Sequence, residues 1–228
     1  RSGSIGRLRR IEMQVWAGAT VRHATAAPVP EGFDYDQWLG PVPWRPYVPA
    51  RVEGHGWMCF WDTADGMHVD MGVHYTDQMQ WTLGRDHGGP VEFEASDLEW
   101  PDPAVHMSET AIRGVFRCRY ADGIEGVMYQ QGAFKERYLR YVGDEGWVQV
   151  DDDTDEVKAH PASLLRLRRS AGSGWADAGD HIRDFLDAVR LRRPPACHPE
   201  AAHRAQTIAL AMTISARLGR RLRWDPVR

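Results

Sequence analysis

The chain has 228 residues, of which 43% are hydrophobic and 26% charged, and its formal net charge is -4. This composition allows one sizeable hydrophobic core, and a mildly acidic chain without a basic stripe excludes nucleic acid as the main partner. No stretch reaches the roughly 20 apolar residues of a membrane span, so no membrane partner is expected. The three cysteines are widely spaced, which indicates neither a disulfide framework nor a zinc site.

The first half of the chain contains one predicted strand, one irregular segment and one predicted helix. The strand lies at 5–17, where bulky apolar residues roughly alternate with polar ones. A segment rich in proline, glycine and aromatic residues follows at 26–53, and its prolines argue against a regular helix or a central strand. Long irregular segments in compact domains often bind ligands or form interfaces. A helix is then predicted at 69–84, with Gly84 as the residue that ends it.

After this helix the hydrophobic period changes to two, which predicts successive strands. They are expected at 90–96, 109–123, 124–134, 135–144 and 146–153. Short turns between neighbours predict an antiparallel meander. Helices with apolar residues on one face are predicted at 180–193 and 200–220. The whole pattern predicts an α+β domain, a largely antiparallel open sheet of about five to seven strands with helices packed on one face.

The helix at 69–84 carries the best candidates for proton transfer. Asp70, His74 and Asp77 are each about one turn apart, so a helix would present them on the same face. A carboxylate one turn from a histidine can orient the imidazole and leave its second ring nitrogen free. Spacing alone favours a simpler interpretation, in which Asp70 and His74 bond to each other at the helix surface. No metal site is expected, because His68, Asp70 and His74 are joined by no HExxH or histidine-rich motif.

Several segments, taken together, resemble one known family. They are DYDQWLGPVPWRPY (34–47), VDMGVHYTDQMQW (69–81), GDEGW (143–147), HIRDFLDAVR (181–190) and RLGRRLRWDP (217–226). In content and order they resemble the glucose-fructose oxidoreductase/inositol dehydrogenase family (Gfo/Idh/MocA), and within it a bacterial subgroup with WLGP and terminal WDP signatures. The resemblance covers residues 1–228 as the C-terminal substrate-binding and oligomerisation domain. The family's N-terminal Rossmann domain is absent, so the chain is expected to be a fragment of a longer enzyme.

The resemblance implies roles for particular residues. Asp70 and His74 match the D-x-x-x-H pattern that the family uses for catalysis, together with a lysine from the nucleotide-binding domain. Asp77 matches a carboxylate often found one turn later. Further candidates for binding the substrate are Trp38, Trp44, Arg45, Tyr47, Trp57 and Trp61. The alternative for the aromatic residues is core packing, and the alternative for Arg45 is an ion pair with the aspartates at 34 and 36.

The function implied is the substrate-binding and catalytic-helix domain of an NAD(P)-dependent oxidoreductase acting on a sugar, cyclitol or related polyol. NAD or NADP would bind in the Rossmann half, so this chain alone is expected to bind no cofactor by the family's mode and to be inactive. The expected partners are the small-molecule substrate and a second copy, which would pack through the sheet face. Cytoplasm is the default compartment, and an export signal could precede the sequence. The alternatives are a lyase or hydratase acting on oxidised sugars, and a non-catalytic interaction module.

Overall fold

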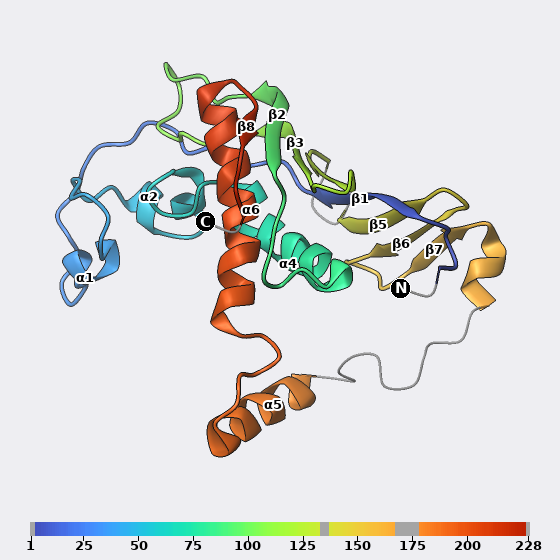
Figure 1. The fold of residues 1–228 in the computed structure, drawn as a ribbon. Coiled ribbons are helices and arrows are strands. Elements are labelled where there is room, and N and C mark those ends of the chain that lie inside the picture. Colours follow the sequence, from blue (N-terminus) through green and yellow to red (C-terminus); the bar gives the residue numbers. More distant parts are fainter. Residues whose placement is uncertain (1–2, 133–136, 167–177, 227–228) are drawn as a thin grey trace.

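An eight-stranded sheet forms the centre of the molecule (Figure 1). The computed structural model describes residues 3–132, 137–166 and 178–226. The strand order across the sheet is β7-β6-β5-β1-β4-β3-β2-β8. The strands are β1 (Leu8–Val15), β2 (Glu92–Glu99), β3 (Arg113–Arg119), β4 (Glu125–Gln130), β5 (Tyr138–Gly143), β6 (Trp147–Asp151), β7 (Val157–His160) and β8 (Leu222–Arg223). The predicted class, a largely antiparallel α+β sheet, is confirmed.

The order of the strands differs from the predicted meander. The β3–β4 and β5–β6 pairs are antiparallel neighbours, as the turn signals predict. However, β1 lies between β4 and β5, parallel to the former and antiparallel to the latter. Turn residues define hairpins locally but carry no information about where a distant strand inserts, which is why the meander is wrong at its centre. The short strands β7 and β8 were not predicted, since they contain only 4 and 2 residues.

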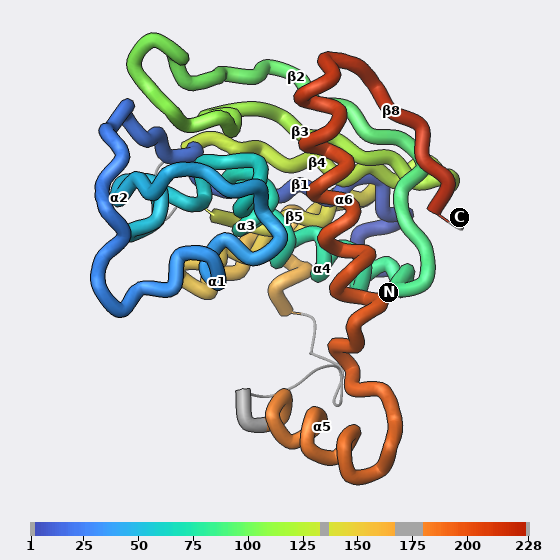
Figure 2. Tube along the Cα trace, turned by 90° about the vertical axis from the view of Figure 1, so that its left-hand side faces the viewer, coloured from blue at the N-terminus to red at the C-terminus, as the bar shows by residue number. Residues whose placement is uncertain are grey.

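Helices cover one face of this sheet, as predicted. The helices on this face are α3 (Met67–Asp70), α4 (Gly72–Leu83) and α6 (Pro199–Leu218). The other helical elements described are α1 (Tyr35–Leu39), α2 (Pro49–Val52), α5 (Ala178–Leu191) and the 3-10 turns η1 (Gly56–Cys59) and η2 (Ala162–Arg166). Figure 2 shows α6 running across the strands, and α4 packs beside α6. The core lies between this helical layer and the sheet and includes Ile11, Met13, Met79, Phe116, Met128, Ile208 and Met212.

The predicted helix at 69–84 is divided into α3 and α4, with Met71 between them. Gly72, the first residue of α4, lies so close to the sheet that a Cβ there would be 2.6 Å from the Cε atom of Met128. Glycine therefore allows this turn to sit directly on β4. The predicted end is confirmed: Gly84 has a left-handed conformation with φ 67°, and its N–H donates to the Gln80 and Trp81 carbonyls.

The proline-rich segment at 26–53 is less irregular than predicted, because it contains α1 and α2. The carboxylate of Asp34 accepts a hydrogen bond of 2.8 Å from the Gln37 N–H and caps α1. Pro49 occupies the first turn of α2, where the missing N–H has no partner to lose. The prolines thus lie outside or at the start of these short helices. Around them Tyr35, Leu39 and Tyr47 form a small core of their own.

Helix α5 stands apart from the sheet and from the other helices in both views (Figures 1 and 2). Its apolar face is turned to solvent, with exposed fractions of 52 to 58% for Ile182, Phe185, Leu186 and Val189. The predicted helix is present, but no described part of the chain covers this face. Among the described residues, none of the helices is long and apolar enough to cross a membrane.

Candidate functional site

The predicted catalytic residues meet where α3 passes into α4. Asp70 is the last residue of α3, and His74 lies in the first turn of α4 with its side chain exposed. Asp77, one turn further along, is partly buried. His74 is close enough to both carboxyl groups to act on their pKa values. The structure therefore brings these three residues together, while their catalytic roles stay a prediction.

Burial dominates the electrostatics of the two carboxyl groups. It raises the pKa of Asp70 above its ordinary value, and the neighbouring His74 and His55 act in the opposite direction. Burial, followed by the nearby Asp86, raises the pKa of Asp77, again against the influence of His74. Sequence reasoning missed His55 and Asp86, because both lie outside the helix. Their sequence positions gave no sign that they would face it.

No hydrogen bond joins Asp70 to His74, so the surface pair suggested by spacing alone does not form. Among the described residues, the exposed side chain of His74 has no hydrogen-bond partner. An exposed imidazole between two partly buried carboxyl groups is suited to accepting and returning a proton.

A buried histidine holds α3 in place from below. His68 is 2% exposed, and its ring stacks on Phe116 with centroids 4.0 Å apart. Its Nδ1 lies 3.0 Å from Oε1 of Gln130 on β4, and its Nε2 lies 2.7 Å from Oγ1 of Thr213 on α6. One side chain therefore ties the start of the candidate catalytic region to the sheet and to the longest helix.

The surrounding bonds define the protonation of His68. Gln130 uses its amide N–H groups to donate to two backbone carbonyls, one of them that of Ala111 at 2.6 Å. Its carbonyl oxygen must therefore accept from Nδ1 of His68, which leaves Nε2 to accept from the Thr213 hydroxyl. Burial lowers the pKa of His68 to about 4, consistent with this neutral ring. Sequence analysis could not find the network, because its members are 62 and 145 residues apart.

Arg45 is held in an ion-pair cluster rather than by the aspartates at 34 and 36. Its guanidinium lies 2.9 Å from Asp62 and 3.1 Å from Glu109. Arg51, which is 2% exposed, reaches the same Asp62 at 2.5 Å and lies over the ring of Phe60. These contacts hold the segment around α2 and η1 together. They give Arg45 a structural role, and its predicted contact with substrate stays a prediction.

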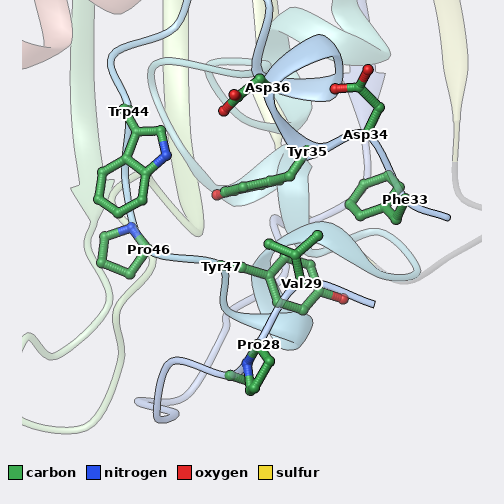
Figure 3. A pocket seen from close by; sticks show the side chains of 10 residues that line it. Pro28, Val29, Phe33, Asp34, Tyr35, Asp36, Trp44, Pro46 and Tyr47 are labelled. Carbon is green, nitrogen blue, oxygen red and sulfur yellow. The ribbon is translucent and has the colours of Figure 1, made fainter. Parts of the chain in front are cut away.

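The aromatic candidates divide into two groups, the first of which surrounds α1. Trp38 stacks on Tyr35 with ring centroids 5.8 Å apart, and Tyr47 packs its edge against the same ring at 5.4 Å. Trp38 therefore packs against this small core, and its predicted contact with substrate stays a prediction. Trp44, by contrast, is 68% exposed, and together with Tyr47 it lines an open groove (Figure 3).

The second group lies between α2 and α3. The indole N–H of Trp57 donates to the Gly54 carbonyl at 3.1 Å, which closes the turn before η1. The ring of Trp61 lies under the Arg217 guanidinium at 4.0 Å and meets Trp100 edge-on. Both residues make structural contacts, and their predicted role at a sugar pocket remains untested.

A metal ion and a dinucleotide are the two bound groups whose fit to the described residues can be tested. In the described part of the chain, no group of three or more His, Cys, Asp or Glu side chains could hold a metal ion. A dinucleotide is usually held where a parallel strand leads through a glycine-rich turn into a helix. Here β1 and β4 are parallel, but β1 leads into an extended segment. The described residues therefore do not form this arrangement.

Comparison with known proteins decides the family. Residues 11–228 match the family described as "Oxidoreductase family, C-terminal alpha/beta domain" of Gfo/Idh/MocA. The chain belongs to the Gfo/Idh/MocA family. Among curated proteins, none matches the sequence. The family and fold predicted from the sequence are confirmed, while the bacterial subgroup with WLGP and WDP signatures stays a prediction.

Solved structures share this Gfo/Idh/MocA fold. The WlbA dehydrogenase from Bordetella pertussis, in complex with NADH and UDP-GlcNAcA, has a TM-score of 0.58 and 15% identity over 98% of this chain and 57% of its own. The aldose-aldose oxidoreductase from Caulobacter crescentus, complexed with glycerol, has a TM-score of 0.62 and 16% identity, over 98% of this chain and 58% of its own. The myo-inositol 2-dehydrogenase from Lactobacillus plantarum has a TM-score of 0.53 and 16% identity, over 98% of this chain and 58% of its own. The chain thus spans less than three fifths of each relative.

Proposed function

We propose that this domain binds the substrate and supplies the proton-transferring histidine of an NAD(P)-dependent oxidoreductase acting on a sugar, cyclitol or related polyol. The observation that carries the proposal is the exposed His74 imidazole, which has no hydrogen-bond partner among the described residues and lies near the carboxyl groups of Asp70 and Asp77. Dehydrogenase neighbours that bind or act on sugar derivatives, glycerol and inositol support the substrate class. A cytoplasmic location is part of the same proposal.

Oxidation of an alcohol requires a base for the hydroxyl proton. His74 accepts this proton at a ring nitrogen, and the nearby carboxylate of Asp70 stabilises the imidazolium that forms through its negative charge. The pKa of Asp70 is raised, so the carboxylate is fully formed only at a higher pH than for an ordinary aspartate. Hydride transfer requires a dinucleotide held against the substrate, which in this proposal is the task of the nucleotide-binding domain.

The proposal includes self-association through the sheet face opposite α4 and α6. There Glu12 is 6% exposed, between Arg10 at 2.7 Å and Arg140 at 3.2 Å. The Arg140 guanidinium also lies 4.9 Å from the ring centre of Trp147. Paired charges and aromatic rings on an eight-stranded sheet are suited to packing against an identical surface related by twofold symmetry.

The test is an assay of the full-length gene product for NAD(P)H formation with a panel of sugars and inositols. We expect His74→Ala to lower kcat by about 10²–10⁴-fold, the usual contribution of a general base. The matched control is His203→Ala, which removes an exposed histidine from α6 and is expected to leave kcat unchanged. Equal kcat for His74→Ala and wild type would refute the assignment. Product release without net NAD(P)H formation would favour the lyase alternative.

A further inference from the structure

The four-residue helix α3 carries Asp70 but cannot hold that residue in place by itself. A single helical turn is not stable in water without packing. Gly66 precedes α3 with a φ of 90°, and no described side chain caps the N-terminus of the helix. The bonds within α3 are local, such as the one from the Asp70 N–H to the Gly66 carbonyl at 3.0 Å. Contacts with other elements must therefore determine where the Asp70 carboxyl group lies.

The buried side chains of α3 differ in how precisely they can anchor it. Three are buried, with exposed fractions of 6, 2 and 3%: Met67, His68 and Val69. Met67 and Val69 are apolar, and burial of apolar surface is non-directional. The His68 ring instead makes two directed bonds, to Gln130 on β4 at 3.0 Å and to Thr213 on α6 at 2.7 Å. His68 therefore joins α3 to two other elements at fixed angles.

These two bonds limit rotation of α3 about its own axis. Figure 2 shows α3 beside α6, and both partners of the ring, Gln130 and Thr213, are buried within their own elements. They cannot follow the ring if α3 turns. Residues two positions apart on a helix point to different sides, so His68 does not face Asp70. His68 can act on Asp70 only through the backbone of α3.

His74 is held separately from Asp70. It lies on α4, which begins after Met71 and has contacts of its own. One of them is the buried hydroxyl of Thr76, which donates to the Ala205 carbonyl on α6 at 3.0 Å. A change in the rotation of α3 would therefore move the Asp70 carboxyl group relative to His74 while α4 stays in place.

We propose that His68 is a positioning residue for Asp70 and His74: its bonds to β4 and α6 hold α3 at the rotation that keeps the Asp70 carboxyl group near His74. His68 is buried and touches neither the substrate nor the transferred proton. A phenylalanine in its place would fill similar space but make no directed bond, so α3 would be free to turn. The inference deepens the proposed function, on which it rests for the chemistry of Asp70 and His74.

Amide hydrogen exchange of the 228-residue chain at neutral pH tests the anchoring of α3. The N–H groups of Val69, Asp70 and Met71 lie 3.0 to 3.1 Å from their carbonyl partners. We expect His68→Phe to speed their exchange by about tenfold or more relative to the amides of α4. The matched control Ile11→Val removes a buried methyl group from β1 and should not change exchange in α3 relative to α4. Circular dichroism confirms that each variant is folded.

Kinetics of the full-length gene product test the positioning role. His68→Phe should lower kcat by about 10–100-fold and change KM less, because a misplaced carboxylate affects proton transfer more than substrate binding. Thr213→Val removes only one of the two bonds, so it should lower kcat in the same direction by a smaller factor. Ile11→Val should leave kcat unchanged.

Two results would overturn this proposal. One is exchange in α3 that His68→Phe speeds no more than exchange in α4, and the other is a wild-type kcat in the folded His68→Phe enzyme. Failure of the proposed function is a separate result, because it is shown by full activity of His74→Ala. The exchange measurement needs no activity, so it decides whether His68 anchors α3 in either case.

Discussion

Replacing His68 by phenylalanine is a direct test of the buried network beneath α3. The variant keeps a flat ring on Phe116 but removes both ring nitrogens. Oε1 of Gln130 is then buried without a donor, which costs about 1–3 kcal/mol of unfolding free energy. The Thr213 hydroxyl contributes less to the loss, because in the variant it can donate to the Ala209 carbonyl, 3.4 Å away, in place of His68.

The effect should depend on pH in a defined direction. Burial lowers the pKa of His68 from 6.5 to about 4. Because the folded-state pKa is depressed, the stability that His68 contributes is complete above pH 6.5 and is lost as pH falls toward 4. At about pH 5 the unfolded chain binds a proton that the folded chain does not, so wild type should lose about 2 kcal/mol relative to about pH 7.5.

Urea denaturation followed by circular dichroism measures this at the two pH values. Other titrating groups are common to both proteins, so the difference between wild type and His68→Phe isolates His68. We expect an advantage of about 1–3 kcal/mol for wild type at about pH 7.5, reduced by about 2 kcal/mol at about pH 5. Thr213→Val, which removes a partner but no titrating group, should keep most of the pH dependence. An advantage of equal size at both pH values would refute the reasoning.

Two further substitutions test other parts of the molecule. Burial raises the pKa of Asp65 to about 6. The folded chain is therefore most stable when this carboxyl group is neutral, and it loses stability as pH rises from about 4 through 6. Asp65→Asn, which tolerates the φ of 60° there, should therefore raise the unfolding free energy by about 1–2 kcal/mol above pH 7 and by little at pH 4. Equal effects at both pH values would contradict this. Tyr129→Glu places a charge on the sheet face opposite α4 and should dissociate an oligomer held together by that face, as measured by sedimentation velocity. The control Ile214→Glu, which places a charge on α6, should leave the oligomer intact. An oligomer that persists in Tyr129→Glu would exclude this face as the interface.

Most secondary structure could be predicted from the sequence, because hydrophobic period and end signals are local. Gly84 ends α4 as predicted, and the strands at 113–119 and 125–130 form the hairpin that their turn indicates. The predictions that were wrong concern features that depend on contacts between residues distant in sequence. The insertion of β1 between β4 and β5 is one case, and the division of the helix at Met71, beside the close contact of Gly72 with Met128, is another.

The candidate site was predicted unevenly for the same reason. Asp70, His74 and Asp77 lie on one helical segment, so their clustering follows from spacing. The aromatic candidates lie on an extended segment without a period, and spacing could not show that Trp38 packs inward while Trp44 is exposed. His68 was considered only as a metal ligand, because its partners Gln130 and Thr213 come from distant elements.

The solvent-facing apolar side of α5 has a consequence for how that segment folds. A helix of 14 residues is marginal in water without packing, and α5 turns Ile182, Phe185, Leu186 and Val189 outward. Whatever surface covers these side chains also decides how often the segment is helical. If a surface covers this face, ordering of α5 and that contact form one coupled equilibrium, in which part of the free energy gained on contact is used to form the helix.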